Sequence, residues 1–274
     1  MMADAKNGTV MIDDTDMDYI TFGKGKRIFV IIPGLGDGLR TVKGTAIAFA
    51  WAYRKLCSDF KVYVFSRKNK LPEGYTTRDM ARDLVTVMKK LGIYQVDVMG
   101  ISQGGMIAQY VAIDYPEMVR NLILTVTLSR QNHQEQLVAR RWIKMAKADN
   151  YKGIITETAE LSYSEKYLKK YRLLYPVLGI LGKPKDFRRF VIQAESCLQH
   201  DAFDELKKIQ SPTLVIGGEC DHIVGGDASR ELAATIRNSE LYMDPSLSHG
   251  LYDEAKDFQT RIIAFLNKEP REHI

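Results

Sequence analysis

The chain has 274 residues, 45% of them hydrophobic and 27% charged, with a formal net charge of +5. This balance fits one large α/β domain or two small ones and excludes a disordered chain. No run of Lys and Arg with interleaved aromatic residues suggests a nucleic-acid partner. The first eight residues lack the apolar core of a signal peptide, and the longest apolar run, near residues 46–53, is too short to span a bilayer.

The three cysteines, Cys57, Cys197 and Cys220, are widely spaced and form no C-x-x-C pair. Such a set fits reduced thiols in a cytoplasm better than a disulfide framework or a zinc site. We therefore predict a cytoplasmic protein without a metal site. Nothing in the sequence indicates an oligomeric state.

Apolar runs alternate with amphipathic segments along most of the chain. Residues 9–12 and 19–22 are expected to form an antiparallel edge, and the continuous apolar run at 27–32 indicates a strand buried on both faces. This alternation predicts the α/β fold class, with a doubly wound, mostly parallel sheet. Further strands are expected at residues 61–65, 95–101, 121–126, 212–217 and 239–243.

Helices are expected between these strands. Thr76 and Asp79 form a capping-box pattern at the start of one helix, and Gly92 is expected to end it. Within that helix, Met80 and Leu84 begin an apolar face with helical spacing. The other expected helices of this series span residues 45–56, 103–114, 227–236 and 253–267.

The pattern changes in residues 128–211, where amphipathic segments occur without any strand signal. We interpret this stretch as a helical insertion into a core made of residues 1–127 and 212–274. The insertion carries 16 Lys or Arg against 10 Asp or Glu, so the positive charge of the chain lies there. Solvated helix faces explain this charge most simply, although it also hints at acidic or amphiphilic substrates.

The most informative motif is Gly100-Ile101-Ser102-Gln103-Gly104, which matches the G-x-S-x-G nucleophile-elbow pattern. It stands between an expected strand and an expected helix. A sharp strand-to-helix turn would hold the hydroxyl of Ser102 outward, near the free N–H groups of the helix start. The motif alone is weak, because glycine-rich turns with an ordinary serine are common.

A base and an acid follow two other expected strands. Ligands bind at the carboxyl ends of the strands in an open parallel sheet. There the sequence places Asp221 after one strand and His249 after the next, giving the chain order Ser, Asp, His. Glu219, two residues before Asp221, is the alternative acid, and we favour Asp221. The other four histidines lie in the insertion, in the tail or directly beside Asp221.

These residues predict one mechanism. His249 would activate the Ser102 hydroxyl, and Asp221 would orient the imidazole. The backbone N–H groups of Gln103 and Leu35 would bind the oxyanion. Leu35 lies in a glycine-rich loop, residues 33–38, whose spacing and following sequence do not match a dinucleotide-binding fingerprint, so we predict no cofactor.

With these motifs, the sequence resembles the alpha/beta-hydrolase fold family, most closely its small, capped single-domain members of the esterase, lactonase and aminopeptidase-like kinds. The resemblance runs from the strand at residue 27 to the last helix, and it implies that the insertion is a lid over the active site. Two departures stand out. Many relatives have His-Gly where this chain has Pro33-Gly34, and many have Met where it has Gln103, a side chain expected to make the pocket more polar.

The sequence therefore predicts a serine hydrolase that cleaves a carboxylic ester, thioester or lactone of a small-molecule substrate through an acyl-enzyme on Ser102. Two alternatives stay open. The same three residues could transfer the acyl group to an acceptor other than water, or the protein could be a non-catalytic ligand-binding member of the fold.

Overall fold

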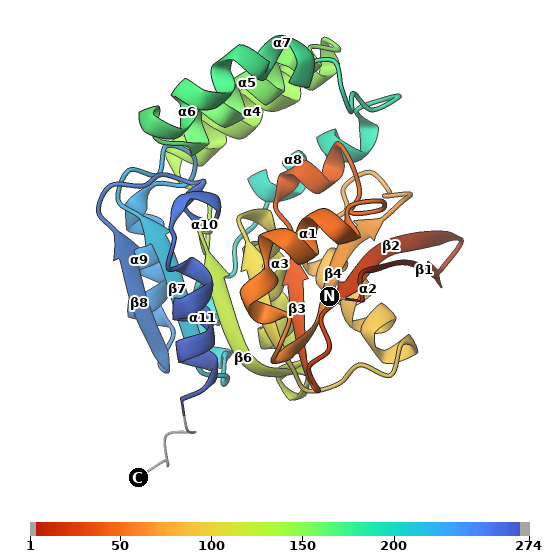
Figure 1. The fold of residues 1–274 in the computed structure, drawn as a ribbon, viewed down its shortest axis with the longest axis vertical. Helices are drawn as coiled ribbons and strands as arrows, with labels where there is room; N and C mark the ends of the chain where they lie inside the picture. Colours follow the sequence, from red (N-terminus) through yellow and green to blue (C-terminus); the bar gives the residue numbers. More distant parts are fainter. Residues whose placement is uncertain (1–3, 269–274) are drawn as a thin grey trace.

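The centre of the computed structural model, which describes residues 4–268, is an eight-stranded sheet (Figure 1). Its order is β1-β2-β4-β3-β5-β6-β7-β8. The pairs β1–β2 and β2–β4 are antiparallel and all later pairs are parallel, as predicted. The strands span Lys6–Ile12, Thr15–Phe22, Arg27–Ile32, Phe60–Lys68, Val96–Ile101, Val119–Thr125, Thr213–Gly218 and Ser239–Asp244.

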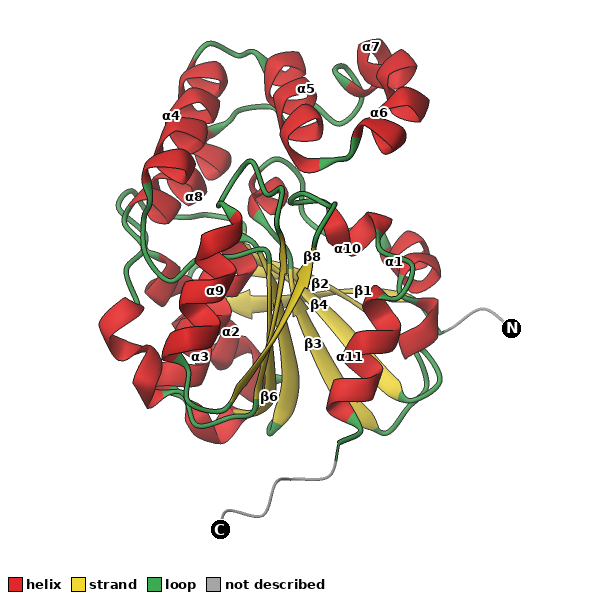
Figure 2. Cartoon of the chain, turned by 90° about the vertical axis from the view of Figure 1, so that its left-hand side faces the viewer, coloured by secondary structure: helices red, strands yellow, loops and turns green. Residues whose placement is uncertain are grey.

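Helices cover both faces of this sheet (Figure 2). On one face α2 (Thr77–Lys90), α3 (Gln103–Asp114) and α9 (Gly226–Thr235) pack in one hydrophobic cluster. On the other face α1 (Ala46–Ala52) and α11 (Phe258–Leu266) pack in a second cluster. Every expected strand is present, and the doubly wound fold class is confirmed.

The start of α2 shows how local sequence sets an element boundary. The hydroxyl of Thr76 accepts a hydrogen bond from the Asp79 backbone N–H, and the Asp79 carboxylate accepts one from the Thr76 N–H. Met80 and Leu84 are buried on the face toward the sheet, and Gly92 adopts a left-handed φ of 70° just after the helix. The predicted cap, face and end of this helix are all confirmed.

Two helix predictions were too long. The helix expected at residues 45–56 ends at Ala52, where Tyr53 leaves helical geometry, and a 3-10 turn, η2 (Arg54–Leu56), follows. The helix expected at residues 253–267 is two helices, α10 (Leu251–Glu254) and α11, because Ala255 is extended with ψ 112°. The apolar spacing continues across both breaks, which is why it did not reveal them.

Between β6 and β7 the chain carries α4 (His133–Lys147), α5 (Tyr151–Ser162), α6 (Glu165–Tyr171), α7 (Tyr175–Leu178) and α8 (Arg188–Leu198). This helical insertion lies over one end of the sheet (Figures 1 and 2). A third hydrophobic cluster joins it to the loops after the strands. Within the described residues, no helix is long and apolar enough to cross a bilayer. The remaining short 3-10 turns are η1 (Leu35–Gly38), η3 (Pro116–Met118), η4 (Arg172–Leu174) and η5 (Phe203–Lys208).

Candidate active site

Ser102 lies at the junction of β5 and α3 in a conformation that L-residues rarely adopt, with φ 54° and ψ −119°. The flanking glycines make the turn sterically allowed. A Cβ on Gly100 would collide with the Gly104 carbonyl, and a Cβ on Gly104 would collide with the Ile32 carbonyl. The Thr127 hydroxyl donates a hydrogen bond of 2.8 Å to the Ser102 carbonyl and helps to hold the turn. The G-x-S-x-G spacing therefore forms a strand-to-helix elbow.

His249 and Asp221 meet at the carboxyl ends of the neighbouring strands. Both side chains are buried, and the His249 Nδ1 lies 2.8 Å from the Asp221 Oδ2. The other carboxylate oxygen, Oδ1, accepts hydrogen bonds from the backbone N–H groups of Ile223 and Val224 at 2.8 and 2.9 Å. A histidine that contacts a carboxylate through Nδ1 leaves Nε2 free for a reacting group.

The environment keeps Asp221 ionised. Burial alone raises the pKa of this carboxyl, but the charge and hydrogen bond of His249, together with the two backbone N–H groups, outweigh burial and hold the pKa below its ordinary value. Glu219, the alternative acid, instead forms an ion pair with Arg230 on the surface. The geometry thus brings Asp221, rather than Glu219, to the histidine.

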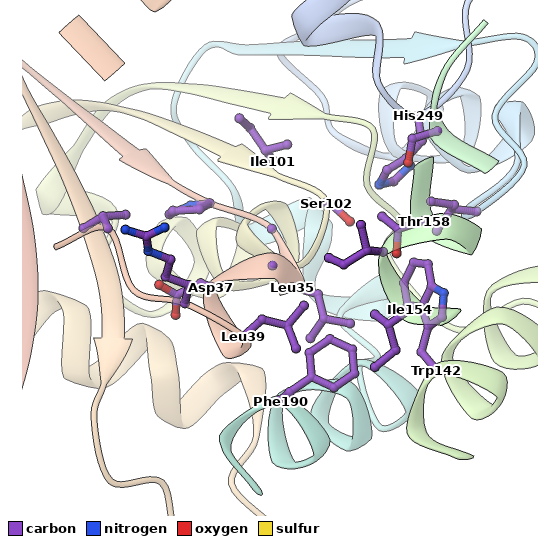
Figure 3. Close-up of a pocket in the computed structure, with 18 of the residues that line it drawn as sticks. Leu35, Asp37, Leu39, Ile101, Ser102, Trp142, Ile154, Thr158, Phe190 and His249 are labelled. Atoms are coloured by element: carbon purple, nitrogen blue, oxygen red, sulfur yellow. The ribbon is translucent and has the colours of Figure 1, made fainter. Parts of the chain in front are cut away.

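Ser102 and His249 line the same pocket, which has a volume of about 370 Å³. Figure 3 shows the serine hydroxyl and the imidazole facing each other, with the side chains of Leu35, Ile154 and Phe190 on the other side of the serine. In the part of the chain that the structure describes, no hydrogen bond joins Ser102 to His249. Contacts of this kind are often long without substrate and tighten when it binds.

Two backbone N–H groups beside Ser102 have no acceptor among the described residues, those of Leu35 and Gln103. Each belongs to the first residue of a helical turn, where N–H groups lack an intrahelical partner. A Cβ built on Gly34 would lie 3.3 Å from the Ser102 Cβ, so the glycine-rich loop runs close against the serine. Leu35 thus lines the same pocket as the serine and the histidine, and the Gln103 N–H directly follows the serine in the chain.

The side chain of Gln103 does not have the role in the pocket that the sequence predicted for it. It is 1% exposed and lies outside the pocket lining, so the prediction that it makes the pocket more polar is wrong. Its Oε1 accepts a hydrogen bond of 2.9 Å from Arg67, and its Nε2 donates one of 2.7 Å to the Gln193 carbonyl of α8. The elbow is thereby connected to β4 and to the insertion.

Arg67 belongs to a buried charged network beneath the glycine-rich loop. It donates to the Pro33 carbonyl at 2.6 Å, and its backbone N–H donates to Asp37. Arg189 of α8 donates to the Asp37 Oδ2 at 2.5 Å. Burial alone raises the pKa of Asp37, but Arg189 and Arg67 hold that pKa below its ordinary value. Burial lowers the pKa of Arg67 to about 10, so its guanidinium stays charged near neutral pH.

Sequence reasoning missed this network entirely. Arg67 lies next to the last residue of β4, Asp37 lies in a turn and Arg189 lies in the insertion, and no spacing relates them. The one available signal was the Ser66-Arg67-Lys68 end of an otherwise apolar strand, since charges at the carboxyl end of a parallel strand face the site.

Most of the pocket lining is apolar. The insertion contributes Trp142, Ile154, Ile155 and Phe190, with Thr158 and Ser162 as its polar lining residues. None of the basic side chains of the insertion lines the pocket. Within the described residues, no three His, Cys, Asp or Glu side chains are arranged to hold a metal ion, and all three cysteines are unpaired.

Comparison with known proteins agrees with this fold. A family model described as alpha/beta hydrolase fold matches residues 27–256. The chain is 24% identical to the serine hydrolase BPHL of Mus musculus over 93% of this chain and 84% of that protein.

Two solved structures share the fold over nearly their whole length. MGS-M2, an alpha/beta hydrolase enzyme from a deep-sea metagenome library, matches with a TM-score of 0.83 and 22% identity, covering 97% of this chain and 99% of that one. The enol-lactonase of Burkholderia xenovorans matches with a TM-score of 0.80 and 18% identity, covering 95% and 100%. The chain is therefore a member of the alpha/beta hydrolase family, and its hydrolase relatives support an enzyme.

Proposed function

We propose that this protein is a serine hydrolase that cleaves a carboxylic ester, thioester or lactone through an acyl-enzyme on Ser102. One observation carries the proposal. The Nδ1 of His249 is held by Asp221 at 2.8 Å, and His249 lines the same pocket as a strained serine that has two free backbone N–H groups beside it. A nucleophile, an oriented base and an oxyanion site are the three parts that acyl transfer needs.

In the first half of the reaction, the Ser102 Oγ attacks the substrate carbonyl carbon while the His249 Nε2 takes the hydroxyl proton. The carbonyl π electrons move to oxygen, and the Leu35 and Gln103 N–H groups donate hydrogen bonds to that oxyanion. When the tetrahedral intermediate collapses, the bond to the leaving alcohol, thiol or ring oxygen breaks. The imidazolium gives its proton to this leaving group.

In the second half, a water molecule replaces the leaving group. His249 takes a proton from the water as its oxygen attacks the acyl carbon, and the same N–H groups bind the new oxyanion. Collapse breaks the bond to Ser102, and the proton returns to the serine oxygen. Asp221 stays ionised throughout and stabilises the imidazolium formed in each half.

The pocket indicates the kind of acyl group. A volume of about 370 Å³, lined mainly by aliphatic and aromatic side chains, suits a compact apolar acyl chain. The hint of acidic or amphiphilic substrates came from the basic insertion, but the basic residue of this lining is Arg40, which lies outside the insertion. The basic side chains of α6 lie on the surface, where solvated charge is the ordinary arrangement.

Replacing the nucleophile tests the proposal. Ser102→Ala should lower turnover of a short aryl ester roughly 10⁴-fold or more, because the remaining groups can only orient water. Ser246→Ala, at an exposed loop serine near the histidine, is the matched control and should keep full activity. Undiminished turnover by folded Ser102→Ala would refute the proposal.

Two further measurements separate the alternatives. A fluorophosphonate probe should label Ser102, and His249→Ala should abolish the labelling. Failure of several such probes to label the wild type would favour a non-catalytic binding role. Ester turnover in the presence of added alcohols, thiols or amines should yield the free acid, whereas dominant transfer products would identify an acyltransferase.

A further inference from the structure

A separate surface lies at the outer end of the insertion. The tip segment, residues 166–185, covers most of α6, all of η4 and α7, and the turn after α7. Figures 1 and 2 place α7 on the side of the insertion away from the sheet. Of the thirteen large hydrophobic side chains exposed in the described chain, seven lie between residues 171 and 181. This concentration distinguishes the tip from scattered exposed residues, which need no explanation.

Four of the exposed aliphatic residues lie in η4 and α7, and the other two lie in the turn that follows α7. They recur at spacings of three and four residues, which is the spacing of one side of a helix. The opposite side, with Gly179 and Tyr175, packs on α5, where Gly179 approaches Lys152 and the Tyr175 hydroxyl donates to Glu160. The apolar stripe therefore faces solvent. Its members, exposed between 40% and 87%, are Leu173, Leu174, Val177, Leu178, Ile180 and Leu181.

The charge of the tip segment indicates what kind of partner it would bind. The segment contains six Lys or Arg and no Asp or Glu. Arg172 and Lys183 are paired with acidic residues outside the segment. Lys166, Lys170 and Lys185 are exposed and make no ion pair among the described residues. An apolar stripe flanked by free lysines is the pattern of a helix that lies in the surface of an anionic membrane.

We propose that the tip segment docks on anionic lipid bilayers, with the apolar stripe inserted among the acyl chains and the lysines at the phosphate groups. A second copy of this chain fits less well. A two-fold dimer would place the same basic patch against itself, which is electrostatically unfavourable. A protruding apolar stripe also suits a deformable lipid surface, because a rigid partner would need a matching groove. The proposal is independent of the chemistry at Ser102.

Vesicle sedimentation of the full chain tests this surface. The wild type should sediment with vesicles of phosphatidylcholine mixed with phosphatidylglycerol and should bind pure phosphatidylcholine much more weakly. Binding should fall as salt rises, because exposed charges are screened. Leu173→Ser/Ile180→Ser and Lys166→Gln/Lys170→Gln/Lys185→Gln should each weaken binding roughly tenfold or more. Circular dichroism should show an unchanged fold, since every substituted side chain is exposed.

Matched controls lie far from the insertion. Met11→Ser removes an apolar side chain that is 62% exposed on the edge strand β1. Lys24→Gln/Lys26→Gln removes two exposed charges before β3, at the opposite end of the sheet. Both controls should bind as the wild type does.

Three results would overturn the proposal. One is the absence of binding to the anionic vesicles, and another is wild-type binding by both tip variants. The third is a lipid-free dimer, measured by sedimentation equilibrium, that Leu173→Ser/Ile180→Ser converts to monomer. That last result would make a second copy the occupant of the stripe.

Discussion

The pKa values of buried carboxylates are shifted in opposite directions in two regions, the loops at the carboxyl ends of the strands and the helical insertion. Asp221 and Asp37 lie in the strand-end loops, where charged partners and backbone N–H groups hold their pKa values low. Glu135 lies in the insertion, where its Oε2 has no hydrogen-bond partner among the described residues and burial raises its pKa to about 7. The two strand-end carboxylates thus have charged partners, including Arg189 of the insertion for Asp37, whereas the Glu135 Oε2 has no hydrogen-bond partner in the described part of the chain.

The largest effect is expected from replacing Asp221, and Glu219, two residues away, provides the comparison. Asp221→Asn should reduce kcat roughly 10³- to 10⁴-fold, because the amide cannot hold the imidazole in the required tautomer or stabilise its charged form. Glu219→Gln should change kcat by less than about twofold, since Glu219 contributes only an exposed ion pair with Arg230. Steady-state ester hydrolysis measures both, and equal losses in the two variants would contradict the assignment of the acid.

A second test concerns the buried network. Arg67→Met should lower kcat roughly 10- to 100-fold with little change in KM, because Arg67 donates hydrogen bonds to the Pro33 carbonyl and the Gln103 side chain, in the two segments that carry the proposed oxyanion donors. Gln103→Met keeps the contact of Arg67 with Pro33 and removes those of Gln103 with Arg67 and Gln193, so it should have a smaller effect of the same kind. A rise in KM with kcat preserved would show that the network shapes the binding pocket instead.

The residues in these two tests differ in how far their roles could be predicted from the sequence. Ser102, Asp221 and His249 could be predicted as one site because the alternation of strands and helices assigns each to a strand end, and parallel strand ends meet at one edge. The role of the Gln103 side chain was not found, because its partners Arg67 and Gln193 depend on how distant segments pack. The same limit applies to the pocket, since helical spacing identifies an apolar face without saying whether that face meets the core or a cavity.

Glu135 provides a test of the insertion itself. Its pKa is about 7 in the folded protein against an ordinary value of 4.5. The protonated form therefore stabilises the fold fully at low pH, and this stabilisation is lost as the pH rises through about 7. The wild type should lose about 2 kcal/mol of unfolding free energy between about pH 5.5 and pH 8 from this group.

Glu135→Gln should remove that part of the pH dependence and be the more stable protein at the higher pH. Urea unfolding at the two pH values measures the effect. Glu117→Gln, at an exposed glutamate far from the insertion, is the control and should follow the wild type. Parallel pH profiles for wild type and Glu135→Gln would show that Glu135 is ionised in the folded state.

The smallest expected effect concerns substrate choice. Ile155 of α5 is partly exposed and lines the pocket, so Ile155→Phe should fill part of the cavity while leaving the fold intact. The ratio of kcat/KM for a longer acyl ester to that for an acetyl ester should fall roughly fivefold. Thr156→Phe adds an aromatic ring to the next residue of the same helix, outside the lining, and should leave the ratio unchanged. An equal shift of the ratio in both variants would show that the effect comes from a change in the whole helix. The side chain of Ile155 would then not determine which acyl chains the pocket accepts.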